Sequence, residues 1–523
     1  MSESDQKKRK LVTTGMVSLI LLSACGGGGG GGSTAVTPPP AQTQPDPYVP
    51  GVFEPSERFR YLCETPPADL PGTQGTSTDE NNWLRSWSNE LYLWYDEIVD
   101  RNPADFATAD YFQLQKTELL TASGAPKDRF HFTIGTEEWI ALSQSGESAG
   151  YGARFELIAA APPRQVVTAY VDAGTPAAAA TLSRGTEIVA INGEDVATTS
   201  NVDLLNDALF PTSEGLTYAF TVLDPGAAST RTVNLTSAIV TTDPVNVVSV
   251  TDTASGPVGY VSFTDHIATS EAELIAAVNQ LSAANITDLV LDLRYNSGGF
   301  LDIANELAFM IAGPVAATGQ VFDEIQFNDK YPDRNPVTNE LLEPDLFHTT
   351  TQGFSTNPGQ PLPSLSLNRV FVITSASTCS ASETIVNGLQ GIGTEVIQIG
   401  TTTCGKPYGF YAFDNCGISY FSIQFRGVNA LGFGAYTDGF SPINVNGIEG
   451  VPVPGCEVAD DYTRQLGDPD EQNFAVALSY RETDLCPVLP AAAQSSLRLS
   501  KYPGDPEQVI TRPPFPGTVR LPR

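Results

Sequence analysis

In residues 245–460, short runs of apolar residues alternate with longer stretches whose apolar residues recur at helical spacing. The runs at 370–374 and 396–399 have the length of buried strands, and a segment of helical pattern, 382–389, lies between them. Strands that alternate with helices in this way are typical of an α/β layer fold. The pattern also predicts strands at 259–263 and 289–293, helices at 271–284 and 300–312, and a long irregular insertion at 313–365.

Residues 147–240 show a different pattern, in which apolar and polar positions alternate as they do in half-buried strands. We predict strands at 153–158 and 165–171, and the pair Asn192-Gly193 suits a tight turn at the end of a third strand. The phrase GTEIVAINGEDV resembles the middle of a PDZ domain. The resemblance implies that Tyr151 and Gly152 belong to a loop that binds the carboxylate of a peptide. A generic small β-rich module is the alternative.

The segment 54–146 carries apolar residues at helical spacing, and Pro103 follows the end of the pattern. We interpret this aromatic stripe as the core of an N-terminal helical domain rather than as a ligand site. The residues that form the stripe are Trp83, Trp87, Leu91, Trp94 and Ile98.

The N-terminus has the pattern of a targeting segment. Four basic residues at 7–10 precede an apolar run, 11–22, which is short for a membrane span. The sequence Leu-Ser-Ala-Cys that ends it resembles a bacterial lipoprotein signal, which implies cleavage before Cys25 and a lipid on its sulfur. An ordinary secretory signal is the alternative. Because Gly26, and not Asp, follows the cysteine, we expect a lipid anchor in the outer membrane of the cell envelope, facing the periplasm or the cell surface.

The charge of the chain is strongly acidic. It contains 60 acidic and 28 basic residues, which gives a formal net charge of −32. Because contacts to phosphates need clustered Lys and Arg, nucleic acid is excluded as an expected partner.

The cysteines predict disulfides. With Cys25 lipidated, six cysteines remain, and an even number in an exported chain favours disulfide pairs. Spacing alone leaves the pairing open; Cys404–Cys416 is the first local candidate and Cys456–Cys486 the second. The spacings match no zinc pattern, so we predict no metal site and no cofactor.

Ser380 stands between a predicted strand and a predicted helix. The sequence Ser380-Ala-Ser-Glu383 is a capping box, so a simple helix cap is one interpretation. The same position places Ser380 beside the orphan N–H groups of a helix start, beginning with Ala381, which stabilise an oxyanion. The functional interpretation is therefore a serine nucleophile.

Lys406 is the candidate base for this serine. The chain has only 3 His, and a lysine that loses its proton through burial activates a serine without histidine. Tyr408, Phe410 and Tyr411 follow it and favour such burial. The segment before Lys406 resembles part of a P-loop, but Pro407 replaces the Ser or Thr that would bind magnesium. An exposed loop lysine is the alternative.

A glycine pair, Gly298-Gly299, follows the strand at 289–293 in the sequence DLRYNSGG. Glycines at such a turn let the backbone approach a ligand closely, so either amide is a candidate oxyanion donor. A simple glycine turn between a strand and a helix is the alternative.

The order DLRYNSGG, TCSASE and GTTTCGKPYG resembles the C-terminal processing peptidases, or tail-specific proteases, over about residues 80–460. The resemblance implies a ClpP/crotonase-like α/β core, Ser380 as nucleophile, Lys406 as general base, and an oxyanion hole from Ala381 with Gly298 or Gly299. Substrates would be proteins or peptides with exposed C-termini. One departure is Phe410, which stands where many members of the family have a glutamine that orients the lysine; Gln424 is a candidate replacement.

Two other functions are compatible with parts of the sequence. A non-catalytic peptide-binding lipoprotein on a decayed protease core is one. An esterase that uses Ser148 in the sequence Gly146-Glu-Ser-Ala-Gly150 is the other, although its elbow needs a strand before the serine and a helix after it.

The predicted segments are a signal peptide (1–24), a Gly/Pro-rich tether (25–53), a helical domain (54–146), a PDZ-like domain (147–240), an α/β core (241–490) and an extended tail (491–523).

Overall fold

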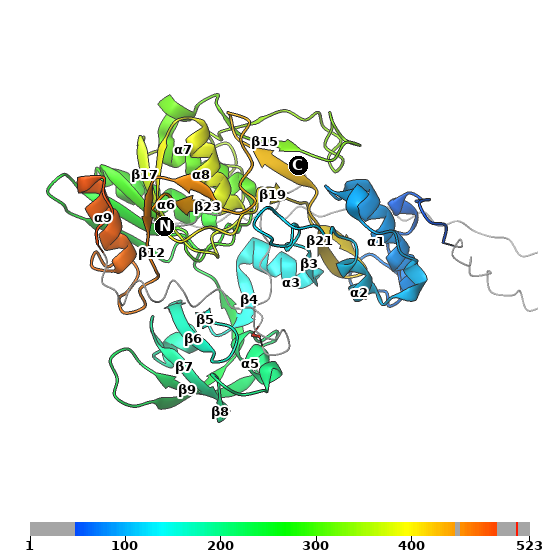
Figure 1. Ribbon diagram of the computed structural model, residues 1–523, viewed down its shortest axis with the longest axis horizontal. Coiled ribbons are helices and arrows are strands. Elements are labelled where there is room, and N and C mark those ends of the chain that lie inside the picture. Colours follow the sequence, from blue (N-terminus) through cyan, green and yellow to red (C-terminus); the bar gives the residue numbers. More distant parts are fainter. Residues whose placement is uncertain (1–47, 445–449, 489–508, 511–523) are drawn as a thin grey trace, which may run out of the picture. The chain divides into compact units, whose positions relative to one another are not determined.

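The computed structural model describes residues 48–444, 450–488 and 509–510 (Figure 1). The predicted signal peptide, Cys25 and most of the tether lie outside these residues, as does most of the predicted tail. Among the helices in the described ranges, none combines the length and the apolar character that a membrane span needs.

The centre of the α/β core is a six-stranded sheet with the order β12-β13-β14-β17-β18-β25. Only β12 runs antiparallel to its neighbour, and the other five strands are parallel. The predicted α/β fold is therefore confirmed. The strands are β12 (Val247–Thr251), β13 (Val258–Ser262), β14 (Asp288–Asp292), β17 (Arg369–Thr374), β18 (Glu395–Gly400) and β25 (Gly455–Glu457).

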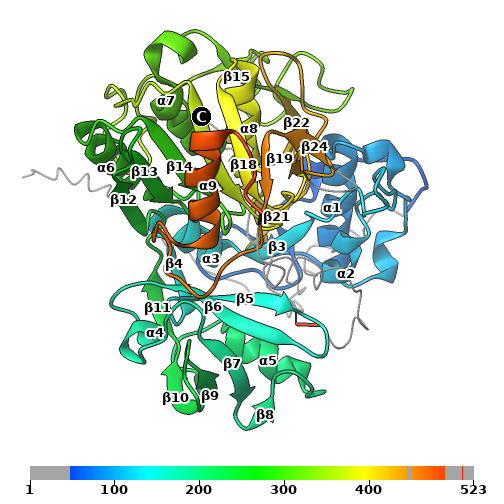
Figure 2. The same cartoon turned by 60° about the vertical axis from the view of Figure 1, so that its left-hand side comes forward.

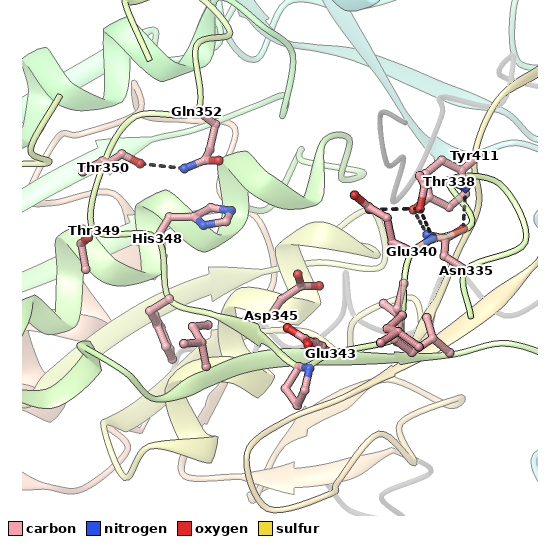
Figure 3. A pocket seen from close by; sticks show the side chains of 16 residues that line it. Asn335, Thr338, Glu340, Glu343, Asp345, His348, Thr349, Thr350, Gln352 and Tyr411 are labelled. Carbon is pink, nitrogen blue, oxygen red and sulfur yellow. Dashed lines mark hydrogen bonds between the residues drawn. The ribbon is translucent and has the colours of Figure 1, made fainter. Parts of the chain in front are cut away.

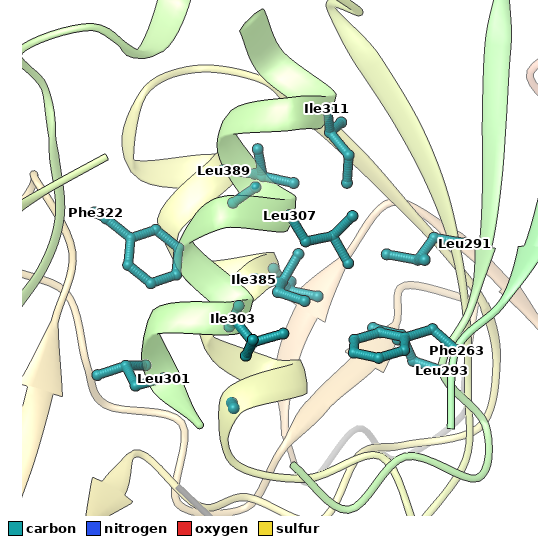
Figure 4. Packing of buried hydrophobic residues seen from close by; sticks show 14 of the residues in the cluster. Phe263, Leu291, Leu293, Leu301, Ile303, Leu307, Ile311, Phe322, Ile385 and Leu389 are labelled. Atoms are coloured by element: carbon teal, nitrogen blue, oxygen red, sulfur yellow. The ribbon is translucent and has the colours of Figure 1, made fainter. Parts of the chain in front are cut away.

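Helices cover both faces of this sheet. Successive side chains of β17 point to opposite faces of the sheet. Val370 and Val372 belong to one apolar cluster, whereas Phe371 and Ile373 belong to another. The first cluster packs against α6 (Ser270–Ala283), α7 (Leu301–Ala317) and α8 (Ala381–Gly391), and the second against α9 (Gln472–Thr483) (Figures 2 and 4). The helix predicted to end at 312 breaks there, because Gly313 has φ 78° and Pro314 follows.

The segment 313–365 is not wholly irregular, so that prediction was wrong in part. It contains β15, which pairs with β22, a strand about a hundred residues further along the chain. Nothing in the local sequence pattern indicates this pairing. The remaining strands of the core region are β15 (Val321–Gln326), β16 (Asp345–Leu346), β19 (Tyr408–Gly409), β20 (Phe413–Asn415), β21 (Ile418–Phe421), β22 (Phe425–Val428), β23 (Phe440–Pro442) and β24 (Val451–Val453).

The N-terminal segment is mainly helical. Trp83 and Trp87 are stacked 5.2 Å apart and buried, so the aromatic stripe is core as predicted. One strand, β3, pairs with β21 and joins this segment to the core region. The elements are η1 (Ser56–Arg58), β1 (Leu62–Cys63), β2 (Thr73–Gln74), α1 (Ser77–Leu91), η2 (Tyr95–Glu97), η3 (Pro103–Asp105), α2 (Thr108–Gln113), β3 (Phe132–Gly135), α3 (Thr136–Ile140) and η4 (Ala141–Ser145).

Residues 147–241, which we call the inserted module, have an apolar cluster of their own. Their antiparallel sheet has the order β10-β9-β7-β6-β5, with β8 paired to β7, so β5 is an edge strand. The entering and leaving strands, β4 and β11, pair with each other. The elements are β4 (Glu147–Gly150), β5 (Ala153–Ala159), β6 (Gln165–Val171), α4 (Pro176–Ala179), β7 (Glu187–Ile191), β8 (Glu194–Asp195), α5 (Val202–Leu209), β9 (Thr217–Leu223), β10 (Arg231–Thr236) and β11 (Ala238–Thr241).

Candidate active site

The three candidate motifs follow three neighbouring parallel strands. DLRYNSGG continues from the end of β14, Ser380 follows β17, and Lys406 follows β18. The carboxyl ends of parallel strands lie at one edge of a sheet. The three motifs therefore lie close together at that edge, although they are far apart in the sequence. The structure thus brings together residues that are more than a hundred positions apart in the sequence.

Ser380 occupies a backbone conformation that L-residues rarely adopt. It is the N-cap of α8, with φ 62° and ψ −118°, and its side chain is buried. Such a conformation costs roughly 1–3 kcal/mol and persists only where the surroundings impose it. The predicted capping box contributes: the Ser380 amide donates to the Glu383 carboxylate at 2.9 Å.

The same Glu383 carboxylate joins the serine to the lysine loop. It accepts hydrogen bonds from the amides of Gly405 and Lys406, both at 2.8 Å, and from Thr403 Oγ1 at 2.5 Å. Burial raises the pKa of Glu383, and the hydrogen bonds that it accepts oppose that rise. One side chain therefore fixes the backbone on both sides of the candidate dyad.

A disulfide makes a second link between the two loops. Cys379, the residue before the candidate nucleophile, is bonded to Cys404, two residues before Lys406. The predicted pair Cys404–Cys416 is therefore wrong. Cys416 lies in the turn between β20 and β21 and pairs with Cys63 of the N-terminal segment. Cys63 and Cys416 are 353 residues apart in the sequence and meet only through tertiary packing, so no spacing rule indicates this pair. The predicted pair Cys456–Cys486 is confirmed.

The Lys406 side chain lies between aromatic rings. Its Nζ is 4.1 Å from the ring centre of Phe410 and 5.0 Å from that of Phe130, and the side chain is buried. Burial lowers the pKa of Lys406 to about 7, although the charges of Asp128 and Glu383 act in the opposite direction. A large fraction of this lysine is thus neutral near pH 7, as a general base requires.

Sequence reasoning missed Phe130 and Asp128. Both come from the N-terminal segment, where nothing in the local pattern marks them as neighbours of Lys406. Asp128 is itself held in place, because it accepts hydrogen bonds from Tyr92 Oη at 2.7 Å and from the Phe130 amide at 2.9 Å. Gln424, the candidate replacement for the family's glutamine, bonds instead to the backbone of Tyr411. The rings of Phe130 and Phe410 thus lie against the Lys406 ammonium, whereas the side-chain hydrogen bonds of Gln424 go to Tyr411.

The glycine pair lies directly against Ser380. A Cβ placed on Gly298, which has φ 103°, would come within 2.9 Å of Ser380 Cβ and 3.1 Å of the Ala381 nitrogen. The Gly298 amide donates to Asn296 Oδ1 at 2.9 Å. Within the described part of the chain, the amides of Ala381 and Gly299 have no hydrogen-bond partner. Two backbone donors are thus available beside the candidate nucleophile.

Comparisons with known proteins agree with this arrangement. Residues 257–409, which include all three motifs, match the model of peptidase family S41. Residues 257–409 are thus similar to an S41 peptidase domain, and we call the α/β core that contains them the S41 domain. A carboxyl-terminal-processing protease from Picosynechococcus sp. is 28% identical over 269 residues, which are 51% of this chain and 56% of that protein. The chain therefore matches little more than half of the length of this relative.

A solved structure shares the fold of the S41 domain and of the segments next to it in this chain. It is a putative S41 protease from Bacteroides fragilis, with a TM-score of 0.57, 20% identity, and coverage of 80% of this chain and 99% of the other. At this level of identity the likeness concerns the fold.

A buried ion network connects the inserted module to the S41 domain. Arg184 of the module donates to Tyr295 Oη and to Asp460 Oδ1, both at 2.6 Å. Arg294 donates to the same Asp460 oxygen at 2.6 Å and to Glu471 at 2.9 Å. The two arginines hold the pKa of Asp460 far below its ordinary value. Because Arg294 and Tyr295 belong to DLRYNSGG, this network joins the module to the loop that carries the glycine pair.

Two further predicted residues lie in the inserted module. Tyr151 is buried, with its ring 5.7 Å from that of Phe220, and Gly152 has φ 69° and packs against Thr175. The Tyr151 carbonyl accepts from the Ala177 amide. Ser148 lies within β4, paired with β11. It is not on a strand-to-helix elbow, so the geometry that an esterase needs at this serine is absent.

One cavity of about 690 Å³ lies away from these residues (Figure 3). It is lined largely by the segment 338–350, and Asn335 Nδ2 donates to Tyr411 Oη at 2.7 Å at its wall. None of the predicted site residues lines it, so the candidate active site of the S41 domain is defined by its side chains rather than by this cavity.

Proposed function

We propose that this protein is a serine endopeptidase of the C-terminal processing type, with Ser380 as nucleophile and Lys406 as general base. The observation that carries the proposal is the Glu383 carboxylate, which accepts hydrogen bonds from the amides of both Ser380 and Lys406. A helix cap alone needs only the first of these bonds. The second supports a site in which the two loops are held together for chemistry.

The lysine acts as a base because it is buried. With a pKa of about 7, neutral Lys406 takes the proton of Ser380 Oγ as this oxygen attacks the substrate carbonyl carbon. The protonated lysine then gives that proton to the leaving amine, and the acyl-enzyme forms. Water then attacks the ester carbonyl carbon while Lys406 takes its proton. The protonated lysine returns a proton to Ser380 Oγ as the acyl C–O bond breaks, and the carboxylate product leaves. This chemistry uses no cofactor.

The negative oxygen of each tetrahedral intermediate needs donors that are already in place. The Ala381 amide at the start of α8 is one, and the helix dipole adds to its effect. The second comes from the Gly298-Gly299 pair, whose approach to Ser380 leaves no room for a Cβ. The Gly298 amide is engaged by Asn296, which favours Gly299 as the donor.

The inserted module is the proposed selector of substrates. Its edge strand β5 begins directly after Tyr151-Gly152, which is the order of a PDZ domain, where a peptide C-terminus binds at the loop and its chain pairs with the edge strand. Substrates are then proteins or peptides with exposed C-termini. The Arg184–Asp460–Arg294 network supports a physical connection from this module to the glycine loop.

The proposed location follows from the N-terminal sequence alone. A lipid at Cys25 would anchor the protein in the bacterial envelope, at the outer membrane, with residues 25–53 as the tether. Palmitate labelling of the wild type and of Cys25→Ser tests this proposal. Equal labelling of the two proteins would contradict it.

Proteolysis of an unfolded protein tests the proposed chemistry. The chain from residue 26 is compared with Ser380→Ala, Lys406→Ala and Ser148→Ala. We expect the first two variants to lose cleavage and the third to retain it. Cleavage that persists in Ser380→Ala would overturn the proposal. A wild type that binds peptides but cleaves none would instead support the non-catalytic lipoprotein, the second candidate, which the phenylalanine at position 410 favours.

A further inference from the structure

The segment that follows β13 lies directly against the glycine pair. The backbone N–H of His266 donates to the Gly298 carbonyl at 3.1 Å, and the His266 carbonyl accepts from the Phe300 amide at 2.8 Å. These two bonds form a parallel bridge between His266 and Gly299. A Cβ on Gly299 would come within 2.3 Å of the His266 oxygen, whereas a Cβ on Gly298 would meet Ser380. The glycine pair is therefore in close contact with both segments.

The bridge determines the direction of the Gly299 amide. Gly299 lies between Gly298, whose carbonyl bonds to His266, and Phe300, whose amide does so. In a parallel bridge of this kind the middle residue directs its own N–H and C=O away from the partner segment. The Gly299 N–H is thus turned away from His266 and is left for another acceptor, as a donor in an oxyanion hole must be.

The His266 side chain adds a third contact to the glycine loop. Its Nδ1 lies 2.9 Å from Asn296 Oδ1, which also accepts from the Gly298 amide at 2.9 Å. Because an amide oxygen only accepts, Nδ1 carries the proton and donates. Burial lowers the pKa of His266 to about 3, although its contacts with Asn296 and Gly298 oppose that shift, so the ring is neutral. Among the described residues its Nε2 has no hydrogen-bond partner, so the side-chain contact depends on Nδ1.

Asn296 also bonds to the nucleophile side of the site. Its Nδ2 donates to the carbonyl of Phe263, the residue after β13, at 3.0 Å. Its own carbonyl accepts from the Cys379 amide and from Ser382 Oγ, both at 3.1 Å. One buried asparagine therefore joins the His266 segment, the glycine loop and the segment that carries the candidate nucleophile.

We propose that His266 is a positioning residue of the oxyanion hole: its backbone bridge directs the Gly299 amide, and its side chain holds the Asn296 oxygen on which the Gly298 amide is fixed. The inference rests on the proposed function, because it assigns a role within the same site. Its effect on the reaction comes through the glycine loop. Since an oxyanion forms in both acylation and deacylation, loss of this positioning lowers kcat and leaves KM unchanged.

Hydrolysis of an unfolded protein by the chain from residue 26 tests the side-chain contact. His266→Leu removes the Nδ1 donor, and we expect kcat to fall about 10- to 100-fold with KM unchanged, a range typical of misplaced catalytic groups. In His266→Asn the side-chain nitrogen occupies the place of Nδ1, so kcat should stay within about threefold of the wild type. In His266→Gln the nitrogen reaches the place of Nε2 instead, so kcat should fall as in His266→Leu.

His348→Leu is the matched control. It removes the same kind of side chain from a hydrogen bond, to Asp302 at 2.8 Å, on the wall of the cavity in Figure 3. We expect kcat and KM of this variant to equal those of the wild type. Equal kcat in the wild type and His266→Leu would overturn the inference. Full activity of His266→Gln together with a loss in His266→Asn would overturn it too, because Nε2 would then be the nitrogen that matters.

Hydrogen exchange separates this inference from the proposed function, because it needs no hydrolysis. It is followed by mass spectrometry of peptides that cover 294–300, with Ser380→Ala present in every chain. Exchange of the Gly298 amide should be about 10-fold faster in His266→Leu and unchanged in His266→Asn, while exchange in β17 stays the same. Unchanged exchange in His266→Leu would contradict the positioning role while the peptidase proposal stands. The expected exchange, with a wild type that hydrolyses nothing, would contradict the peptidase proposal alone.

Discussion

The nucleophile side and the base side of the candidate active site are built in different ways. Ser380 is set by its own neighbourhood: a strand before it, a helix after it, and Glu383 three residues on. Lys406 depends on residues from elsewhere, because Phe130 and Asp128 come from the N-terminal segment and Phe410 from the loop that follows. Local sequence fixes the position of the serine, whereas tertiary packing sets the protonation of the lysine.

The largest expected effect separates these two sides. Lys406→Met should reduce kcat/KM for an unfolded protein by a factor of about 10²–10⁴, the usual contribution of a general base. Its fold should remain intact, because methionine fills the space between the rings. Retention of more than a tenth of the activity, with native circular dichroism, would mean that another group accepts the serine proton.

The same variant should be more stable than the wild type. Burial lowers the pKa of Lys406 from 10.5 to about 7, so below pH 7 the folded protein carries a buried charge. This penalty, about 3–5 kcal/mol, is fully present below pH 7 and disappears as the pH rises toward 10. Urea unfolding at pH 6.5 and pH 9.5 measures it: the advantage of Lys406→Met should be larger at the lower pH. A difference that does not change with pH would contradict the assigned pKa.

Gly298→Ala tests the close approach on the nucleophile side. The added Cβ meets Ser380 Cβ at 2.9 Å, and we expect activity to fall roughly 10- to 100-fold as the serine loop shifts, a range typical when reacting groups are misplaced. Gly393→Ala is the matched control. Gly393 also has a positive φ, 81°, but a Cβ there meets nothing within 4 Å. Equal activities of the two variants would contradict a role for the contact between Gly298 and Ser380.

The disulfides offer a matched pair of variants. Cys379→Ser/Cys404→Ser opens a link of sequence separation 25, and Cys456→Ser/Cys486→Ser opens one of 30. Loops of such similar length predict similar losses of stability, about 2–4 kcal/mol. Only the first pair joins the loops of Ser380 and Lys406, so only it should also lower kcat, by about 3- to 10-fold. Unchanged kcat in the first pair would leave Glu383 as the sole effective link.

The smallest effect concerns the ring that stands in place of a glutamine. Phe410→Gln brings a polar group to Lys406, which eases solvation of the ammonium and raises the pKa of the lysine. The acid limb of the pH profile of kcat/KM, expected near pH 7, should move upward by less than about one unit. Tyr411→Phe, which removes only the hydroxyl bonded to Asn335, should leave the limb in place. A downward shift in Phe410→Gln would contradict this interpretation.

The sequence predicted those parts of the molecule in which short segments act alone. The strands and helices around Ser380 and Gly298 have strong hydrophobic periodicity. Because each motif follows a strand of the parallel sheet, the position of both motifs at one edge of this sheet could be predicted. The partners of Lys406 and the bond between Cys63 and Cys416 depend on chain segments that meet only after folding. The pairing of β15 with β22 belongs to the same class. The hydrophobic periodicity of a segment does not indicate which distant segment it contacts in the folded protein.

The bond between Cys379 and Cys404 makes the geometry of the dyad depend on where the chain folds. Glutathione keeps thiols reduced in the cytosol, whereas oxidation takes place outside it. A chain that remains in the cytosol therefore keeps both cysteines as thiols, with the serine and lysine loops joined by Glu383 alone. Under the proposed export, oxidation would add the covalent bond only after the chain has left the cytosol. Full activity of the proposed dyad would then be confined to an oxidising compartment.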